Sequence, residues 1–251
     1  MKKPNLSLII ITKNCSQTLE RTLRSVVDLV DEIILVDDHS TDQTLAIAKQ
    51  YHAKIFDYSG SFGQRKLFAL KKADGNWILN LDSDEVLSKK LKTEIRVILK
   101  NPSASAYYLP YQNYCFDRPL LHGGEKYQML RFFKKEAAII NNNLIHEHFE
   151  LKAGYQVGKL RNNILHYSYR SLPQIYSKFT QYALLLANEK TRKNEKTGLK
   201  KIFLYPIHMF WARFFKDKGY QDGFIVRLPL DLGFAYMEFL TYFLMLFPKK
   251  I

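Results

Sequence analysis

Short apolar runs alternate with stretches of helical periodicity through the first hundred residues. The runs that indicate strands lie at 6–11, 32–36, 54–57 and 77–81. The segments that indicate helices lie at about 19–30, 41–51, 64–70 and 88–101. Nearly continuous apolar runs are typical of strands that are covered on both faces, and strands alternating with helices favour a parallel sheet with right-handed crossovers. Ser40 with Gln43, and Ser88 further on, fit helix-capping positions.

The pattern changes after about residue 104. Strands are predicted at 106–111 and 129–134 with no full helical crossover between them, so this part is expected to be antiparallel or mixed. Helical periodicity returns from residue 172. A polar, cationic break follows at 190–201, and two apolar, aromatic stretches follow at 202–215 and 224–247.

The predicted strands end in loops that are rich in polar residues. In open parallel sheets, ligands bind beyond the carboxyl ends of the strands. Lys13, Asn14 and Asp37 lie in two of these loops, and Asp82 and Asp84 lie in a third. Strand alternation would put Asp82 and Asp84 on one side, where two carboxylates repel unless a cation lies between them. Mg²⁺ or Mn²⁺ fits such oxygen ligands, and a solvated acidic turn that caps the next helix is the alternative.

Composition narrows the class of partner. The chain has 251 residues, 47% hydrophobic, and a formal net charge of +14, which points to nucleic acid, a phospholipid surface or a phosphorylated substrate. Nucleic acid is disfavoured because the carboxylates gather at the strand ends and would repel phosphate. The two cysteines give no disulfide framework and indicate a reducing cytoplasm. The sequence contains no run of about 18 uncharged apolar residues, so no membrane-spanning helix is predicted.

Several stretches together resemble family 2 glycosyltransferases. Those at 8–14, 32–42, 62–70 and 79–85 are similar to the nucleotide-sugar-binding part of that family. Those at 122–124, 130–135, 145–147 and 165–170 resemble one branch, the lipopolysaccharide core β-1,4-glucosyltransferases. Two departures affect donor or acceptor choice. Cys15 stands where branch members carry an acidic residue, and Glu125-Lys126 stands where they have Trp and Asp.

The resemblance implies the nucleotide-diphospho-sugar transferase (GT-A) fold, an α/β Rossmann-like mixed sheet flanked by helices. It implies a catalytic domain at 1–170, with a nucleotide-sugar-binding part at 1–103 and an acceptor-binding part at 104–170. A helical extension at 171–251 would follow, and its aromatic and basic residues suit contact with an anionic membrane surface.

The implied activity is inverting, metal-dependent transfer of a hexose, with glucose favoured, from a UDP-sugar to a lipid-linked acceptor of the lipopolysaccharide or lipooligosaccharide inner core. Residues matching the nucleotide-sugar site are Thr12, Lys13, Asn14, Asp37, Gln64, Lys66 and Asp82. Asp84 and Asp82 would hold Mg²⁺ or Mn²⁺. Glu147 would be the general base, with Glu125 as the alternative.

The expected location is the cytoplasm, peripheral on the inner face of the cytoplasmic membrane. Three other interpretations stay open. The chain could act on another cell-envelope glycan, or it could be a non-catalytic protein that binds nucleotide or anionic membrane. A nucleotidyltransferase that makes the sugar nucleotide is the third, but its Gly-rich signature is absent after Ile11.

Overall fold

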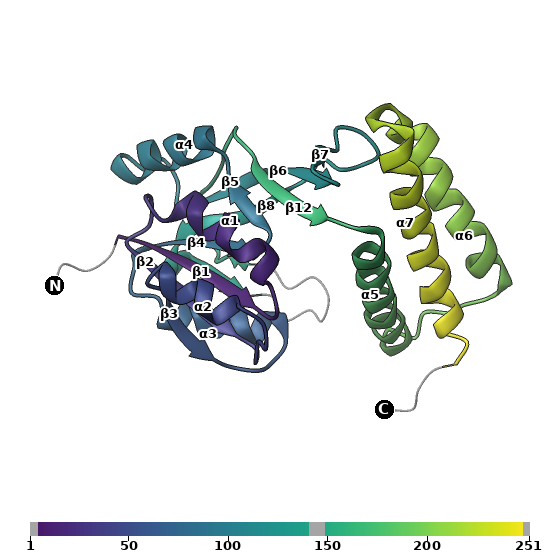
Figure 1. Cartoon of the computed structure of the whole chain (residues 1–251), viewed down its shortest axis with the longest axis horizontal. Coiled ribbons are helices and arrows are strands. Elements are labelled where there is room, and N and C mark those ends of the chain that lie inside the picture. The colour runs from purple at the N-terminus through teal and green to yellow at the C-terminus, as the bar shows by residue number, and fades with distance from the viewer. Residues whose placement is uncertain (1–4, 141–148, 248–251) are drawn as a thin grey trace. The chain divides into compact units, whose positions relative to one another are not determined.

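The four predicted apolar runs form neighbouring parallel strands of one sheet (Figure 1). This computed structural model describes residues 5–140 and 149–247. The strands are β1 (Leu6–Thr12), β2 (Glu32–Asp37), β3 (Lys54–Asp57) and β4 (Trp77–Asp82), in the order β3-β2-β1-β4. Each neighbouring pair is parallel, as the alternation of strands and helices predicts.

Helices cover both faces of these strands. They are α1 (Ser16–Val26), α2 (Thr44–Gln50), α3 (Phe62–Lys72) and α4 (Lys89–Lys100). Leu8 and Ile10 belong to a core cluster with side chains of α1, α2 and α4, whereas Ile9 and Ile11 belong to a second cluster with side chains of α3. Successive residues of a strand point to opposite faces, so β1 must be apolar throughout.

The rest of the sheet contains antiparallel pairs and one parallel pair, β11 with β6, which confirms the expected mixed topology. β6 (Ala106–Cys115) and β12 (Ile164–Tyr169) continue the sheet beyond β8 (Gln128–Lys134), and β8 runs antiparallel beside β4. The three-residue strand β5 (Glu85–Leu87), which the sequence pattern missed, pairs with β12. The remaining strands are β7 (Arg118–Pro119), β9 (Ala138–Ile140), β10 (Phe149–Leu151) and β11 (Val157–Lys159), and η1 (Lys135–Ala137) is a short 3₁₀ helix.

One predicted helix boundary is wrong. The helix expected from residue 41 begins at Thr44, and no side chain caps it. The Ser40 hydroxyl is not available as a cap because it donates to Asp37 Oδ1 (2.6 Å) and accepts from the backbone N–H of Asn14 (2.8 Å). The cap predicted at Ser88 is confirmed, since its hydroxyl accepts from the N–H of Leu91.

The chain divides into two compact units. The first comprises residues 1–111 and 127–166, and the second comprises 112–126 and 167–251. The second unit contains the helices α5 (Leu172–Arg192), α6 (Leu199–Trp211) and α7 (Phe224–Leu244), with a π-helical turn η2 (Ala212–Lys216) and a 3₁₀ turn η3 (Gly219–Asp222). In it α7 packs against both α5 and α6. Within the described residues, every helix is too short or too polar to cross a membrane.

Buried ion pairs explain the charges that interrupt the apolar sequence of α7. Arg227 and Asp231 are both fully buried and lie one helical turn apart, with Arg227 Nη2 at 2.7 Å from Asp231 Oδ1. Arg213 from η2 also contacts Asp231 (3.2 Å), and both arginines contact the carboxylate of Glu125. Burial raises the pKa of Asp231, and the two guanidinium charges oppose that rise. The pairs therefore join segment 112–126 to the helices.

Gly123 is required at the point of closest approach. Its φ is +70°, and a Cβ there would lie 1.7 Å from Arg227 Nη2. Any larger residue at 123 would displace the arginine from its carboxylates.

We expect Arg227→Leu to lower the free energy of unfolding by about 3–5 kcal/mol, because it leaves Asp231 buried with less neutralising charge. The double variant Arg227→Leu/Asp231→Leu should lose less, since it removes both charges and leaves Arg213 paired with Glu125. Urea unfolding of the full chain checks this. The exposed Arg192→Leu is the matched control, and a double variant as unstable as the sum of the single variants would contradict the account.

Candidate functional site

The parallel register brings the predicted polar residues to one edge of the sheet. Thr12 pairs with Asp37 across β1 and β2, and Ile11 pairs with Asp82 across β1 and β4. Because these strands run the same way, their carboxyl ends share an edge. The structure therefore gathers the side chains that follow β1, β2 and β4, as the sequence predicts.

Asp37 is buried and shapes the loop that follows β2. Its carboxylate accepts hydrogen bonds from the hydroxyl of Thr12 (2.8 Å), from the hydroxyl of Ser40 (2.6 Å) and from the backbone N–H of Ser40 (2.7 Å). Thr12 and Asp37 thus act as a unit that fixes the edge of the sheet.

Lys13 and Asn14 tie the loop after β1 to the loop after β2. Lys13 Nζ lies 3.0 Å from Asp38 Oδ2, and Asn14 Oδ1 accepts from the backbone N–H of Thr41 (2.8 Å). The φ of Asn14 is +49°, a conformation that asparagine tolerates better than most residues. The two loops therefore form one connected rim around this edge.

The start of α3 supplies cations to the same edge. Ser61 and Gln64 form a reciprocal capping box, so the Gln64 side chain is part of the cap. Arg65 and Lys66 are both buried, with Arg65 Nη1 at 3.7 Å from Asp38 Oδ2 and Lys66 Nζ at 3.4 Å from Asp82 Oδ1. These two residues are internal partners of the carboxylates and not a solvated basic turn.

Arg131 of β8 connects the acidic residues after β4. Its Nη2 lies 2.7 Å from Asp82 Oδ2 and 2.8 Å from Glu85 Oε1, and its Nε donates to the hydroxyl of Tyr111 (2.6 Å). The same hydroxyl donates to Glu85 Oε1 (2.8 Å), and the backbone N–H of Asp82 donates to Glu85 Oε2 (2.9 Å). Arg131, Glu85 and Tyr111 were not predicted as site residues. An arginine between apolar residues of a strand, with Met129 and Leu130 before it and Phe132 and Phe133 after it, is the signal that could have identified Arg131.

Charge and burial act in opposite directions on the two carboxyl groups. Burial would raise the pKa of Asp82, but the charges of Arg131 and Lys66 outweigh it and hold this pKa well below its usual range. Burial raises the pKa of Glu85, against the charge of Arg131, and the nearby Asp82 carboxylate raises it further. Asp82 is therefore ionised at neutral pH, and it is already compensated by cations of the chain.

Asp84 has a partner that the sequence did not suggest. The chain turns at residues 83–84, so the strand alternation assumed for Asp82 and Asp84 does not apply there. Asp84 Oδ1 lies 3.4 Å from His166 Nε2, and His166 Nδ1 lies 3.1 Å from the hydroxyl of Tyr127. His166 is placed by β12, which pairs with β5 at Glu85.

Whether a divalent cation could bind here depends on the side-chain oxygen and nitrogen atoms that could coordinate it. Within residues 5–140 and 149–247, no three His, Cys, Asp or Glu side chains are grouped to hold a metal. Both oxygens of Asp82 face cations of the chain. Asp84 and His166 offer a carboxylate and an imidazole, which suit Mn²⁺, and Mg²⁺ commonly takes few protein ligands beside substrate phosphates and water. Asp84 therefore fits the predicted role better than Asp82.

The two candidate bases differ in what the structure shows. Glu147 lies outside the described residues. Glu125 lies in the second unit, where its carboxylate is buried, contacts Arg213 and Arg227, and accepts from Asn113 Nδ2 (2.8 Å). A base at Glu125 would have to give up these contacts.

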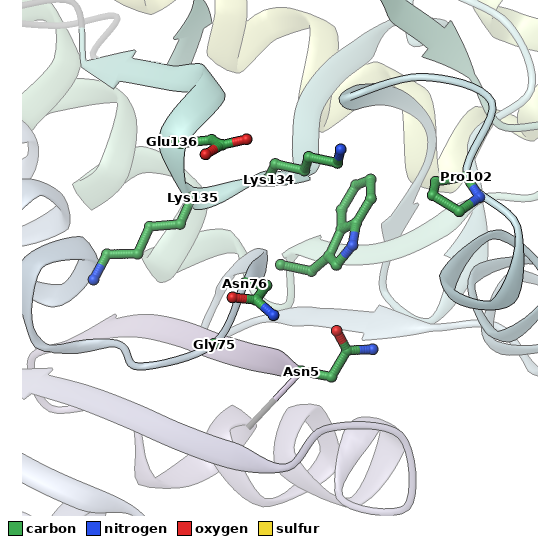
Figure 2. Close-up of a pocket in the computed structure, with 8 residues that line it drawn as sticks. Asn5, Gly75, Asn76, Pro102, Lys134, Lys135 and Glu136 are labelled. Carbon is green, nitrogen blue, oxygen red and sulfur yellow. The ribbon is translucent and has the colours of Figure 1, made fainter. Parts of the chain in front are cut away.

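A cavity of about 690 Å³ lies at the other edge of the sheet, where β1 and β4 begin (Figure 2). Its lining residues include Asn5, Asn76, Trp77, Lys134 and Glu136. The cavity is separate from the carboxylate edge because Asn5 precedes β1 and Trp77 is the first residue of β4, whereas the carboxylates lie where these strands end.

Comparison with known proteins identifies the family of this chain. The protein-family model described as "Glycosyl transferase family 2" matches residues 7–157. An uncharacterized glycosyltransferase of Rickettsia felis is 31% identical over 252 residues, which cover 94% of this chain and 87% of that protein. Another, of Rickettsia prowazekii, is 32% identical over 256 residues, with 96% and 85% covered.

A solved structure shares the fold. The Staphylococcus aureus protein TarS, a poly(ribitol-phosphate) β-N-acetylglucosaminyltransferase, is 24% identical over 203 residues, which cover 76% of this chain and 34% of that protein. The crystal structure of its residues 1–349 with UDP-GlcNAc has a TM-score of 0.50, covers 95% of this chain and 89% of that chain, and is 17% identical. At that identity the likeness shows the fold alone.

We expect Arg131→Met to lower the free energy of unfolding by about 3–5 kcal/mol at pH 7, because Asp82 and Glu85 lose their shared cation. The folded-state pKa of Asp82 lies below the unfolded value of about 3.9, so its stabilisation is present above that pH and is lost as the pH falls toward the folded pKa. The deficit of the variant should therefore shrink as the pH falls from 7 to below about 4.

Urea unfolding across this pH range measures the effect. Arg96→Met, which removes an exposed partner of Asp28, is the control and should cost less than about 1 kcal/mol at every pH. A deficit of Arg131→Met that stays constant with pH would contradict the electrostatic role.

Proposed function

Because the chain belongs to glycosyl transferase family 2, we propose that it transfers a hexose, with glucose as the favoured sugar, from a UDP-sugar to a lipid-linked acceptor. The transfer would invert the anomeric carbon in one displacement. The observation that supports this best is the group of charged residues at the carboxyl edge of β1, β2 and β4. There Asp84 contacts His166, and Arg131 contacts Asp82. The finer resemblance to the lipopolysaccharide core branch stays a prediction.

The donor would bind along the rim formed by the loops after β1 and β2. Thr12, Lys13, Asn14 and Asp37 would contact the nucleoside through backbone and side-chain groups, with Gln64 at the start of α3 beside them. Lys13 is exposed and can reach a phosphate, at the cost of its contact with Asp38. The rim is held by hydrogen bonds before any donor arrives, so little ordering would be needed on binding.

The diphosphate would lie toward Lys66, Asp82 and Asp84. Lys66 is the fifth residue of α3, and its ammonium group, 3.4 Å from Asp82 Oδ1, would offer positive charge to the diphosphate. Asp84, with His166, would hold Mg²⁺ or Mn²⁺. The chemistry that such a cation supplies is neutralisation of the charge that builds up on the departing UDP. Arg131 would keep Asp82 ionised and fixed, and it would thereby hold the turn that carries Asp84.

The acceptor hydroxyl must lose its proton as its oxygen attacks the anomeric carbon and the bond to UDP breaks. We assign that proton to Glu147, in line with the family resemblance. Glu125 is the weaker choice because two guanidinium groups already contact its carboxylate.

The net positive charge of the chain is the basis for the acceptor that we propose. With 38 Lys and Arg against 24 Asp and Glu, the chain suits an acceptor that carries phosphate. The phosphorylated inner core of lipopolysaccharide or lipooligosaccharide fits, and so does another anionic cell-envelope glycan, as the name of the S. aureus relative indicates for that protein. We propose that the enzyme works in the cytoplasm on the inner face of the cytoplasmic membrane.

Donor binding is the direct test of this function. We expect a UDP-hexose with Mn²⁺ to raise the melting temperature, because a ligand at about 100 times its Kd stabilises by about 2.7 kcal/mol. A panel of UDP-glucose, UDP-GlcNAc, UDP-galactose and GDP-mannose identifies the donor. Asp84→Asn should lose the Mn²⁺-dependent part of the shift, whereas Asp74→Asn, an exposed aspartate at the other edge, should keep it. A full shift of Asp84→Asn in the presence of EDTA would refute the metal assignment.

We expect Glu147→Gln to lower kcat for transfer by at least 100-fold while the affinity for the donor stays within twofold, because a base acts only on the acceptor proton. Transfer to a deacylated core oligosaccharide and donor binding by calorimetry separate the two effects. Glu125→Gln is the comparison and should act mainly on stability. Loss confined to donor affinity in Glu147→Gln would rule this residue out as the base.

A further inference from the structure

A row of exposed apolar side chains follows one side of α6 and continues into η2. Its members are Leu199, Phe203, Ile207, Trp211 and Phe215, spaced four residues apart and between 51% and 73% exposed. Side chains four residues apart lie on the same side of a helix. Because an α-helix has 3.6 residues per turn, residues spaced four apart shift gradually around its axis. The π-helical turn, which bonds residue i to i+5, has more residues per turn and shifts Phe215 back in the opposite sense.

The packing of the second unit does not require this row. The inner side of α6 already has its core contact through Ile202, which clusters with Tyr242 of α7 and with Met245 directly after α7. Phe214 is the buried residue of η2. The row therefore consists of apolar side chains in excess of what this core uses, and continuous exposed apolar surface of this kind marks an interaction site.

The charges beside the row indicate what it contacts. Residues 196–216 contain no Asp or Glu, and exposed lysines lie at both ends of the row. Lys196 and Lys200 lie at its start, and Lys216 and Lys218 lie at its end on either side of the exposed Asp217. The second unit as a whole carries sixteen Lys and Arg against eight Asp and Glu. Such a surface complements a partner that is apolar and anionic, whereas a second copy of the chain would bring lysines against lysines.

We propose that this row enters the interface of an anionic phospholipid membrane, with α6 lying parallel to the surface. Lysines at both ends would contact lipid phosphates while the aromatic and aliphatic side chains enter the boundary with the acyl chains. The biological reason for membrane binding rests on the proposed function, because a lipid-linked acceptor lies at a membrane surface. Binding to vesicles can be measured without any glycosyl transfer.

The two tryptophans of the chain give a direct readout. Trp211 belongs to the row, whereas Trp77 is 5% exposed and stacks on Phe132 in the first unit. On adding vesicles of 30% phosphatidylglycerol in phosphatidylcholine to the full chain, we expect the tryptophan emission to shift to shorter wavelength. Trp211→Phe should abolish the shift. Vesicles of phosphatidylcholine alone, or 0.5 M salt, should weaken binding several-fold.

Co-sedimentation with the same vesicles tests the row itself. Phe203→Ser/Ile207→Ser should lower the partition coefficient at least fivefold, and Val97→Ser, which removes an exposed apolar side chain of α4, should not change it. Equal partition of the double variant and the wild type, or no binding by the wild type, would overturn the proposal. So would a wild-type dimer in sedimentation velocity that the double variant dissociates, because the row would then be a protein interface.

A separate measurement keeps the two proposals apart. The melting-temperature shift with a UDP-sugar should be the same in Phe203→Ser/Ile207→Ser and in the wild type. Vesicle binding without any donor shift would refute the proposed function alone, and a donor shift without vesicle binding would refute the membrane surface alone.

Discussion

The ion pairs of Arg131 with Asp82 and Glu85 are the interaction on which the candidate site depends. A parallel sheet delivers the residues after each strand to one edge, so carboxylates of like charge gather there and repel one another. Arg131 opposes that repulsion from within the sheet, together with Lys66, which contacts Asp82. It comes from β8, which runs antiparallel to β4 in a register that pairs Leu79 with Phe132. The mixed topology therefore serves the site directly, because it places a cation beside the acidic end of β4.

The second unit uses the same physical solution for packing. Arg227 and Asp231 are charged residues inside an apolar helix, and they are tolerated because each is paired. Their network reaches Glu125, and Asp222 of η3 accepts from the backbone N–H and from Nδ1 of His122. The His122-Gly-Gly124 stretch, which is one carrier of the branch resemblance, and Glu125, which departs from the branch, thus bind the helices of their own unit. A role in packing accounts for both without any contact with substrate.

The two units differ in where their apolar residues lie. In the first unit the apolar residues of β1, β2 and β4 are buried between helices, and charge remains at the strand ends. The second unit has about 100 residues and three main helices, and a unit of this size buries a smaller share of its surface than a larger domain does. Apolar residues therefore remain outside on α6, and their regular spacing separates an organised surface from scattered exposure.

The sequence by itself determined the parallel sheet, the helices on both faces and the gathering of polar residues at one edge. Each of these follows from local periodicity, because a strand covered on both faces must be apolar at every position, as β1 is. Only the tertiary structure decided which charges meet. His166 reaches Asp84, and Arg131 reaches Asp82, through strand pairings that join residues far apart in the chain. The late start of α2 has the same cause: Asp37 and Asn14 bind Ser40, and local capping preference could not reveal that competition.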